Sequence, residues 1–484
     1  MTESLVHSDA DNAEIDVVAI DTPNLGDRSY VVGRGGSAIV IDPQRDIDVV
    51  EQILADRGWN ASHVLETHFH NDYVSGGLEL SRRTGAEYVV PTGMDIAFAA
   101  NAVSDKAELA SDVGLVRVLL TPGHTPNHLS YAVNVGGEDL ALFTGGSMLY
   151  GSVGRPDLLG PDHTTPLAHA QWQSMRRLRD EVTHSAALYP THGFGSFCSA
   201  TATVGTSSTL AEQVASNPAF HVEEDTFVTE LIAGLDVFPR YYAHMGPANQ
   251  AGAGPIDLSL PRMATASDIA GSVARGEWVV DLRHRRIFAA EHIRGSLSFD
   301  VHGNAVTYLG WLIDWGTPLT LIGESVEEVA LMQRELVRIG IDRPAAYAIG
   351  SPSDWTTPTT PISTYPRVTH VELAAALAAD PALPMLDLRR NSEWDYGHIS
   401  GAMHVPLHEL RGRLDEVVTW AQAQPREIWT YCGSGFRASV GASLLEAAGV
   451  SLVHVDDDFP RAEKAGLPIT VPAHEHSLGE TYAD

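Results

Sequence analysis

The feature that most constrains this chain is a series of histidines placed in loops that follow short apolar runs. His68 and His70 lie two residues apart after the first such run, so both side chains face one side of an extended strand. His124 follows in a Pro-Gly turn, and His192 comes after a further apolar run. Imidazole is a common ligand of zinc, iron and related metals. The ordered series therefore predicts metal-dependent chemistry on an α/β scaffold.

Length, charge and cysteine content restrict the class of protein. The chain has 484 residues, which predicts about three domains. Its formal net charge of -31 argues against binding to nucleic acid or to an anionic membrane. We expect a soluble cytoplasmic protein, because no signal peptide and no apolar run of about 18 residues is visible. Cys198 and Cys432 lie far apart and are predicted to be separate thiols rather than a disulfide.

Composition and internal similarity divide the chain into segments. Asp281-Leu282-Arg283 matches Asp387-Leu388-Arg389, and further matches on either side indicate that one domain has been duplicated. A stretch rich in glycine, proline and alanine precedes the first copy and reads as a linker. The predicted segments are a disordered tail at 1–14, a large α/β domain at 15–245, a linker at 246–262, the two copies at 263–360 and 361–473, and a tail at 474–484.

A cysteine loop in the second copy has the features of an anion-binding or nucleophilic site. The apolar run 428–431 leads into Cys432-Gly433-Ser434-Gly435-Phe436-Arg437, and a predicted helix follows. Glycines allow backbone N–H groups to point into such a loop, and the helix N-terminus adds positive potential. We therefore expect a stabilised thiolate at Cys432. In the first copy Gly323 and Glu328 stand at the positions of Cys432 and Arg437, so we expect a non-catalytic spacer or docking domain.

This loop, together with Asp387-Leu388-Arg389 and Gly397-His398-Ile399-Ser400-Gly401-Ala402, resembles the rhodanese family of sulfurtransferases. The resemblance implies that Cys432 carries a persulfide held by the amides of residues 433–436, with Arg437 at the end of the loop. The spacing of four residues between Cys432 and Arg437 suits sulfur substrates such as thiosulfate, with sulfite as a partner. The stretch 456–460 departs from the family, which usually has a Gly-Gly turn followed by Trp.

The histidine series resembles the metallo-β-lactamase superfamily. Within it, the segments 154–159 and 192–198 resemble the persulfide dioxygenases that are fused to rhodanese domains. The resemblance implies an αββα sandwich followed by two rhodanese-like doubly wound α/β domains, and an iron(II) held by two histidines and an aspartate. The aspartate position is Gly146 here, and a histidine of the second metal site is replaced by Tyr73.

These two replacements change the expected site. We expect one iron(II) per chain held by His68, His70 and His124, with Asp72 and His192 behind them; zinc, or no metal, are the alternatives. Cys198 either contacts the substrate persulfide or packs as an ordinary thiol. Arg155 either orients the substrate or pairs with Asp157.

The leading functional hypothesis is a persulfide dioxygenase and sulfurtransferase. It would oxidise a low-molecular-weight thiol persulfide to sulfite and transfer sulfane sulfur through Cys432. One alternative is a sulfurtransferase alone, with a catalytically degenerate first domain. A second alternative, a zinc-dependent thioester hydrolase, is disfavoured by the losses at Tyr73 and Gly146. The sequence leaves a homo-oligomer open.

Overall fold

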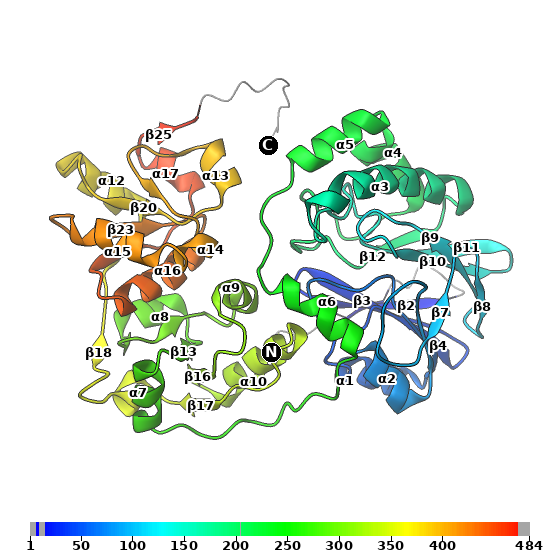
Figure 1. Ribbon diagram of the computed structural model, residues 1–484, viewed down its shortest axis with the longest axis horizontal. Coiled ribbons are helices and arrows are strands. Elements are labelled where there is room, and N and C mark those ends of the chain that lie inside the picture. The colour runs from blue at the N-terminus through cyan, green and yellow to red at the C-terminus, as the bar shows by residue number, and fades with distance from the viewer. Residues whose placement is uncertain (1–5, 9–14, 204, 473–484) are drawn as a thin grey trace. The chain divides into compact units, whose positions relative to one another are not determined.

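The computed structural model describes residues 6–8, 15–203 and 205–472, which form two compact units (Figure 1). Of these residues, the first unit holds those up to Ser259 together with Val306–Trp311 and Ala330–Arg343. The second unit holds the rest of the described chain. The predicted segment 263–360 is therefore divided between the two units. Among the described residues, no helix combines the length and the apolar character needed to span a membrane.

Two sheets form the centre of the first unit. The seven-stranded sheet follows chain order and is antiparallel up to β4 and parallel beyond it. The five-stranded sheet has the order β12-β11-β10-β9-β8, with β11 and β12 parallel. The strands are β1 (Val6–Ser8), β2 (Asp16–Thr22), β3 (Asp27–Arg34), β4 (Ser37–Ile41), β5 (Asn60–Leu65), β6 (Glu87–Pro91), β7 (Asn101–Val103), β8 (Glu108–Ala110), β9 (Leu115–Leu120), β10 (Leu129–Val135), β11 (Glu138–Gly145) and β12 (Ala187–Pro190).

Helices cover the outer face of each sheet, because alternate strand residues are apolar on both faces. Tyr30, Val32 and Phe143 belong to the core between the sheets, whereas Val31 and Val40 face α1 (Asp48–Arg57) and α2 (Gly77–Thr84). The outer face of the other sheet packs on α3 (Pro161–Glu181) and α5 (Glu224–Ala233) (Figure 1). The predicted αββα sandwich is thus present in the first unit. Short helices α4 (Leu210–Ser216) and η1 (Pro218–Phe220) complete this layer.

Helix α6 (Tyr242–Ala251) occupies the first part of the stretch that we expected to be a linker, 246–262. Asn249 explains the difference: its side-chain amide donates to the backbone carbonyls of His70 and Tyr73, and its Oδ1 accepts from the N–H of Ser75. These tertiary bonds outweigh the helix-breaking composition of the segment. In the same way, β1 places three residues of the expected N-terminal tail in a sheet. The rest of that tail and residues 474–484 lie outside the described residues.

The second unit contains two parallel sheets whose strands follow a similar order, and the second sheet has one additional edge strand. The sheets run β15-β13-β16-β17 and β22-β20-β23-β24-β19. Their strands are β13 (Trp278–Asp281), β15 (Leu297–Ser298), β16 (Leu319–Gly323), β17 (Ala346–Ile349), β19 (Arg367–Val368), β20 (Met385–Asp387), β22 (Met403–His404), β23 (Ile428–Tyr431) and β24 (Leu452–Val455). Two small antiparallel pairs join β14 (His292–Ile293) to β18 (Ile362–Ser363) and β21 (His398–Ile399) to β25 (Ile469–Thr470).

Corresponding helices of the two copies begin with the same kind of cap. Thr265 caps α7 (Ala266–Ala274) with Asp268, and Thr369 caps α12 (His370–Ala379) with Glu372, each as a capping box. The remaining helices of the copies are α8 (Arg285–Ala290), α9 (Ala305–Leu312), α10 (Val326–Arg338), α11 (Pro352–Trp355), α13 (Asn391–Tyr396), α14 (Leu407–Leu410), α15 (Leu414–Gln422), α16 (Phe436–Ala447) and α17 (Pro460–Lys464).

A buried ion pair holds the end of α10 inside the first unit. Arg338 donates two hydrogen bonds to Asp46, at 2.6 and 2.9 Å, and a third to Glu335. Burial opposes ionisation of Asp46, but Arg338 lowers the pKa of this carboxyl below its usual value. The carbonyl of Arg338 accepts from the N–H of Val74, four residues after His70. This contact links α10 to the histidine loop.

Replacing Arg338 should destabilise the first unit strongly. We expect Arg338→Ala to lower the free energy of unfolding by about 3 kcal/mol, because it leaves the Asp46 carboxylate buried without its main partner. Arg343→Ala is a matched control, since Arg343 pairs with Asp257 at the surface and should change stability far less. Urea unfolding of the full chain measures both. Equal losses in the two variants would contradict this assignment.

Candidate functional site

Three histidines from loops of both sheets of the first unit meet at one point. His68 follows β5, His124 follows β9 and His192 follows β12. One ring nitrogen of each lies within 4.8 Å of the other two, and the Nε2 atoms of His68 and His192 are 3.2 Å apart. All three side chains are fully buried. The structure therefore forms a three-imidazole cluster, but with His192 in the place that we expected for His70.

The second ring nitrogen of each of these histidines has its own hydrogen-bond acceptor. Nδ1 of His124 donates to the carbonyl of Arg155 at 2.8 Å, and Nδ1 of His192 donates to Asp27 at 2.8 Å. Nδ1 of His68 donates to the Thr67 hydroxyl at 2.8 Å, because that hydroxyl gives its own proton to Asp42. Each ring is thereby left with Nε2 for the cluster. Metal-binding histidines usually have such a partner on the other nitrogen.

The three histidines of the cluster differ in their tendency to carry a proton. Burial, followed by the charge of His192, lowers the pKa of His124 to about 3, and burial also holds the pKa of His68 well below its usual value. Burial disfavours a charged His192 too, but Asp72 and Asp27 raise the pKa of His192 to about 10. Without a metal, His192 is therefore an imidazolium whose Nε2–H can donate to His68.

The donor atoms fit a metal ion. Nε2 of His124 is buried and has no hydrogen-bond partner among the described residues. The lone pairs of His68 and His192 face each other, so a proton or a cation must lie between them. Two nitrogens bound to one tetrahedral zinc ion are about 3.4 Å apart, close to the 3.2 Å observed. A single transition-metal ion could thus replace the proton.

His70 lies in a different environment from the one predicted. Its ring stacks on Tyr73, with centroids 4.2 Å apart, and its Nε2 lies 3.3 Å from Asp42 and 3.5 Å from Glu66. Burial opposes protonation, but Asp42 and then Glu66 raise the pKa of His70 to about 9. A charged imidazole is a poor ligand, so this carboxylate pair competes with any metal for His70. A ring nitrogen of His70 also lies within 4.8 Å of ligand atoms of Asp72 and His192.

Asp72 and Cys198 lie behind His192. Asp72 accepts a hydrogen bond from the hydroxyl of Ser196 at 3.1 Å, and its carboxylate also lies 3.1 Å from Nδ1 of His192. Cys198 is fully buried, with its sulfur 3.8 Å from the hydroxyl of Tyr242. Burial, together with the charge of Asp72, raises the pKa of this thiol well above its usual value. These contacts favour the packed-thiol alternative for Cys198.

Two glycines make room for the ring of His124. A Cβ atom at Gly146 would overlap the ring, and a Cβ at Gly154 would lie 2.8 Å from its Nδ1. The N–H of Gly146 donates to Nε2 of His128 at 3.0 Å. The position of the expected aspartate is therefore filled by His124 itself. Five further residues contact the cluster or its partners and were not predicted: Asp27, Asp42, Glu66, Thr67 and His128.

Arg155 has a structural role in this region. Its guanidinium forms a bidentate pair with Asp157 at 2.7 and 2.8 Å and also donates to the carbonyl of Phe197. Its side chain is buried, and its own carbonyl accepts from His124. The arrangement favours the pairing alternative over a direct contact with substrate.

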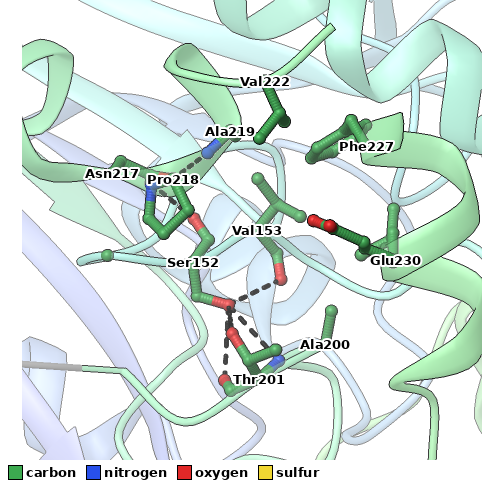
Figure 2. Close-up of a pocket in the computed structure, with 12 residues that line it drawn as sticks. Ser152, Val153, Ala200, Thr201, Asn217, Pro218, Ala219, Val222, Phe227 and Glu230 are labelled. Carbon is green, nitrogen blue, oxygen red and sulfur yellow. Dashed lines mark hydrogen bonds between the residues drawn. The ribbon is translucent and has the colours of Figure 1, made fainter. Parts of the chain in front are cut away.

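A separate pocket of about 150 Å³ opens in the same unit (Figure 2). The hydroxyl of Ser152 bonds to that of Thr201 at 2.6 Å, and the carbonyl of Ser152 accepts from the amide of Asn217. Its lining residues are Gly151, Ser152, Val153, Ala200, Thr201, Asn217, Pro218, Ala219, Val222, Phe227, Glu230 and Leu231. The histidines are not among them, so pocket and cluster are distinct features.

The cysteine loop of the second unit has the predicted geometry. Cys432 ends β23, and its sulfur accepts hydrogen bonds from the N–H groups of Gly435 at 3.2 Å and Ala438 at 3.3 Å. Gly435 has a φ of 87°, a conformation that favours glycine. Ser434 is exposed, whereas Gly433 is half-buried and Cys432 and Phe436 are buried. Backbone amides at the start of α16 thus surround the sulfur.

Arg437, at the end of the loop, forms an ion pair with Glu393. Its guanidinium forms two bonds to Glu393, at 2.5 and 2.7 Å. Burial opposes ionisation of Glu393, but Arg437 lowers the pKa of this carboxyl to about 2. The arginine therefore closes the side of the loop, next to Gly433. The electrostatic support of Cys432 comes from backbone N–H groups.

The corresponding loop of the first copy is filled by its own carboxylate. The side chain of Glu328 accepts from the N–H of Glu324 at 2.7 Å. A Cβ atom at Gly323 would lie 2.7 Å from the same carboxylate oxygen. The loop at Gly323 thus contains neither a nucleophile nor space for an added anion.

Two family models match separate parts of the chain. Residues 25–192 match the family model of the metallo-beta-lactamase superfamily, and residues 369–460 match that of the rhodanese-like domain. The rhodanese-like match covers one of the two predicted copies. The crystal structure of a metallo-beta-lactamase from Staphylococcus aureus is similar over 69% of this chain and 99% of its own, with 25% identity and a TM-score of 0.62.

Several curated relatives are named hydroxyacylglutathione hydrolase. The protein from Methylococcus capsulatus is 33% identical over 152 residues, which are 30% of this chain and 53% of that protein. The protein from Rhodopseudomonas palustris is 30% identical over 190 residues, 38% of this chain and 67% of that protein. The chain spans about half the length of several curated relatives that it matches. This chain belongs to the metallo-beta-lactamase superfamily and carries a C-terminal rhodanese domain.

Adding a side chain at position 146 should disturb His124. We expect Gly146→Ala to lower the free energy of unfolding by about 1–3 kcal/mol, because its Cβ overlaps the buried ring. Gly254→Ala is the matched control, since a Cβ there meets no atom within 4 Å. Urea unfolding measures both variants. A Gly146→Ala protein as stable as the control would contradict the close approach of His124.

Proposed function

We propose that this chain is a sulfur-metabolism enzyme with two centres. The first unit oxidises a low-molecular-weight thiol persulfide to sulfite, and Cys432 of the second unit transfers sulfane sulfur. The observation that carries the proposal is the Cys432 loop, in which two backbone N–H groups point at a sulfur on a strand–loop–helix turn. The rhodanese-like match over residues 369–460 supports the same assignment.

Sulfur transfer at Cys432 balances without any cofactor. The Cys432 thiolate attacks the outer sulfur of thiosulfate, the S–S bond of thiosulfate breaks, and sulfite leaves with the electron pair. The product is a Cys432 persulfide, and an acceptor such as cyanide then removes the outer sulfur as thiocyanate. The amides of Gly435 and Ala438 stabilise the negative charge on sulfur.

Oxidation in the first unit requires a metal, which the histidine cluster would hold. The overall reaction converts one persulfide, one dioxygen and one water into a thiol, sulfite and two protons, so that sulfur loses the four electrons that dioxygen gains. Iron(II) would supply the electron-transfer chemistry that lets dioxygen react with the persulfide. Asp72 and Asp27 compensate the positive charge of the cluster, and its burial excludes water.

Two alternatives remain, each with its own support. A sulfurtransferase without oxidase activity is supported by the metal-free hydrogen bond between His192 and His68, which satisfies both buried rings. A zinc-dependent thioester hydrolase is supported by the curated relatives named hydroxyacylglutathione hydrolase. The hydrolase is disfavoured because Tyr73 stacks on His70 and Gly146 provides no carboxylate for a second metal.

Sulfur transfer should depend on one cysteine. We expect Cys432→Ser to abolish the formation of thiocyanate from thiosulfate and cyanide, because its hydroxyl cannot carry a sulfane sulfur. Cys198→Ser is the control, since this thiol lies in the other unit and is fully buried. Mass spectrometry of protein treated with thiosulfate should show one added sulfur in the wild type and none in Cys432→Ser. Full activity of Cys432→Ser would overturn the assignment.

Oxidase activity should require bound iron. We expect protein reconstituted with iron(II) under anaerobic conditions to consume dioxygen and release sulfite when cysteine persulfide is added, in equal amounts. The Cys432→Ser variant should retain this activity, because the two centres catalyse separate reactions. Iron-loaded protein that transfers sulfur but makes no sulfite would establish the sulfurtransferase alternative. Cleavage of a glutathione thioester by zinc-loaded protein would favour the hydrolase instead.

A further inference from the structure

We propose that His68, His124 and His192 bind a single transition-metal ion through their three Nε2 atoms, without a carboxylate ligand, and that His70 stays outside this ligand set. The proposal deepens the proposed function, because it names the residues that would hold the metal. It differs from the set that we predicted from the sequence, in which His70 was a ligand and His192 was not.

The main evidence for this ligand set is the hydrogen bond that each of the three histidines makes through Nδ1. These bonds pin the rings through the Thr67 hydroxyl, the Arg155 carbonyl and the Asp27 carboxylate, at 2.8 Å in each case. Two of these acceptors are themselves fixed: Thr67 donates to the buried Asp42, and Arg155 is held by its bidentate pair with Asp157. Three imidazoles held from behind in this way need little reorganisation to bind an ion.

His70 is excluded by its contacts. Its ring lies flat on Tyr73, and its Nε2 lies 3.3 Å from the Asp42 carboxylate and 3.5 Å from that of Glu66. Recruiting this nitrogen to a metal ion would take it away from two buried carboxylates that it now contacts, at a cost in stability. His192 carries no such cost, because its bond to Asp27 uses the other ring nitrogen.

Gly146 and Gly154 limit which side chains can join the ligand set. Both glycines approach the ring of His124, and the Cβ atom of a carboxylate side chain at position 146 would overlap that ring. An acid therefore cannot join the ligand set while His124 keeps its place. Asp72 and Asp27 lie behind His192 and would offset the charge of a bound ion.

The chemistry of the donor set defines the class of ion. Three neutral imidazole nitrogens suit zinc, cobalt(II) or iron(II), whereas magnesium and calcium require oxygen ligands. Three protein ligands leave a coordination position for a small molecule. The site would therefore bind a borderline transition metal with a free position.

Cobalt(II) alone is the probe, added to metal-free full-length protein without any persulfide. We expect one cobalt per chain and visible absorption bands of a low-coordinate cobalt site. His192→Ala should weaken binding by about 100-fold or more, whereas His70→Ala should change it by less than about tenfold. Retained binding in His192→Ala together with loss in His70→Ala would overturn the proposal, as would wild-type protein that binds no cobalt.

A second measurement uses the wild-type chain and does not depend on variants folding. Proton NMR of the cobalt(II) protein should show three paramagnetically shifted, exchangeable imidazole N–H signals, one for each Nδ1–H that keeps its acceptor. Fewer than three such signals would overturn the three-Nε2 set. The cobalt test and the oxidase test can fail independently. A protein that binds cobalt in this way and makes no sulfite would refute only the oxidase activity.

Discussion

The buried carboxylate of Asp42 is the interaction on which the histidine loops depend. It follows β4 with a φ of 50°, an uncommon conformation for a residue with a side chain. The carboxylate accepts from the N–H and hydroxyl of Thr67 and from the hydroxyl of Thr191, and it faces His70. Burial alone would raise the pKa of Asp42, but His70 and these donors lower it. One buried charge thus joins loops from both sheets, and the hydrogen bonds offset the backbone strain.

The loss of an acid at position 146 and the placement of His124 are one structural change. Gly146 donates its N–H to His128 and lets the ring of His124 lie directly against the backbone. The negative charge near the cluster comes instead from Asp27 and Asp72, which act through His192. The cluster therefore has three imidazole rings at its centre and its carboxylates behind them.

The resemblance to the metallo-β-lactamase superfamily implied the αββα sandwich. Short-range patterns of apolar runs, glycines and spacing predicted the loops that carry the histidines and the Cys432 loop. The sequence did not predict the contacts of His70. Those contacts depend on Asp42 and Glu66, which meet His70 only after two strands have paired in register. The helix through Ala251 was missed for the same reason, since the bonds of Asn249 to the histidine loop lie far away in sequence.

Two arginines of the segment 263–360 contact a residue that lies next to the Cys432 loop. Arg285 and Arg286, at the start of α8, bond to Asp456 at 2.7 and 3.0 Å. Asp456 lies directly behind Gly435, the residue whose N–H points at the Cys432 sulfur. The arginines hold Asp456 in its ionised form, and their pKa-lowering effect exceeds the opposing effect of burial. The segment 263–360 thus contributes side chains that hold Asp456 next to the Cys432 loop.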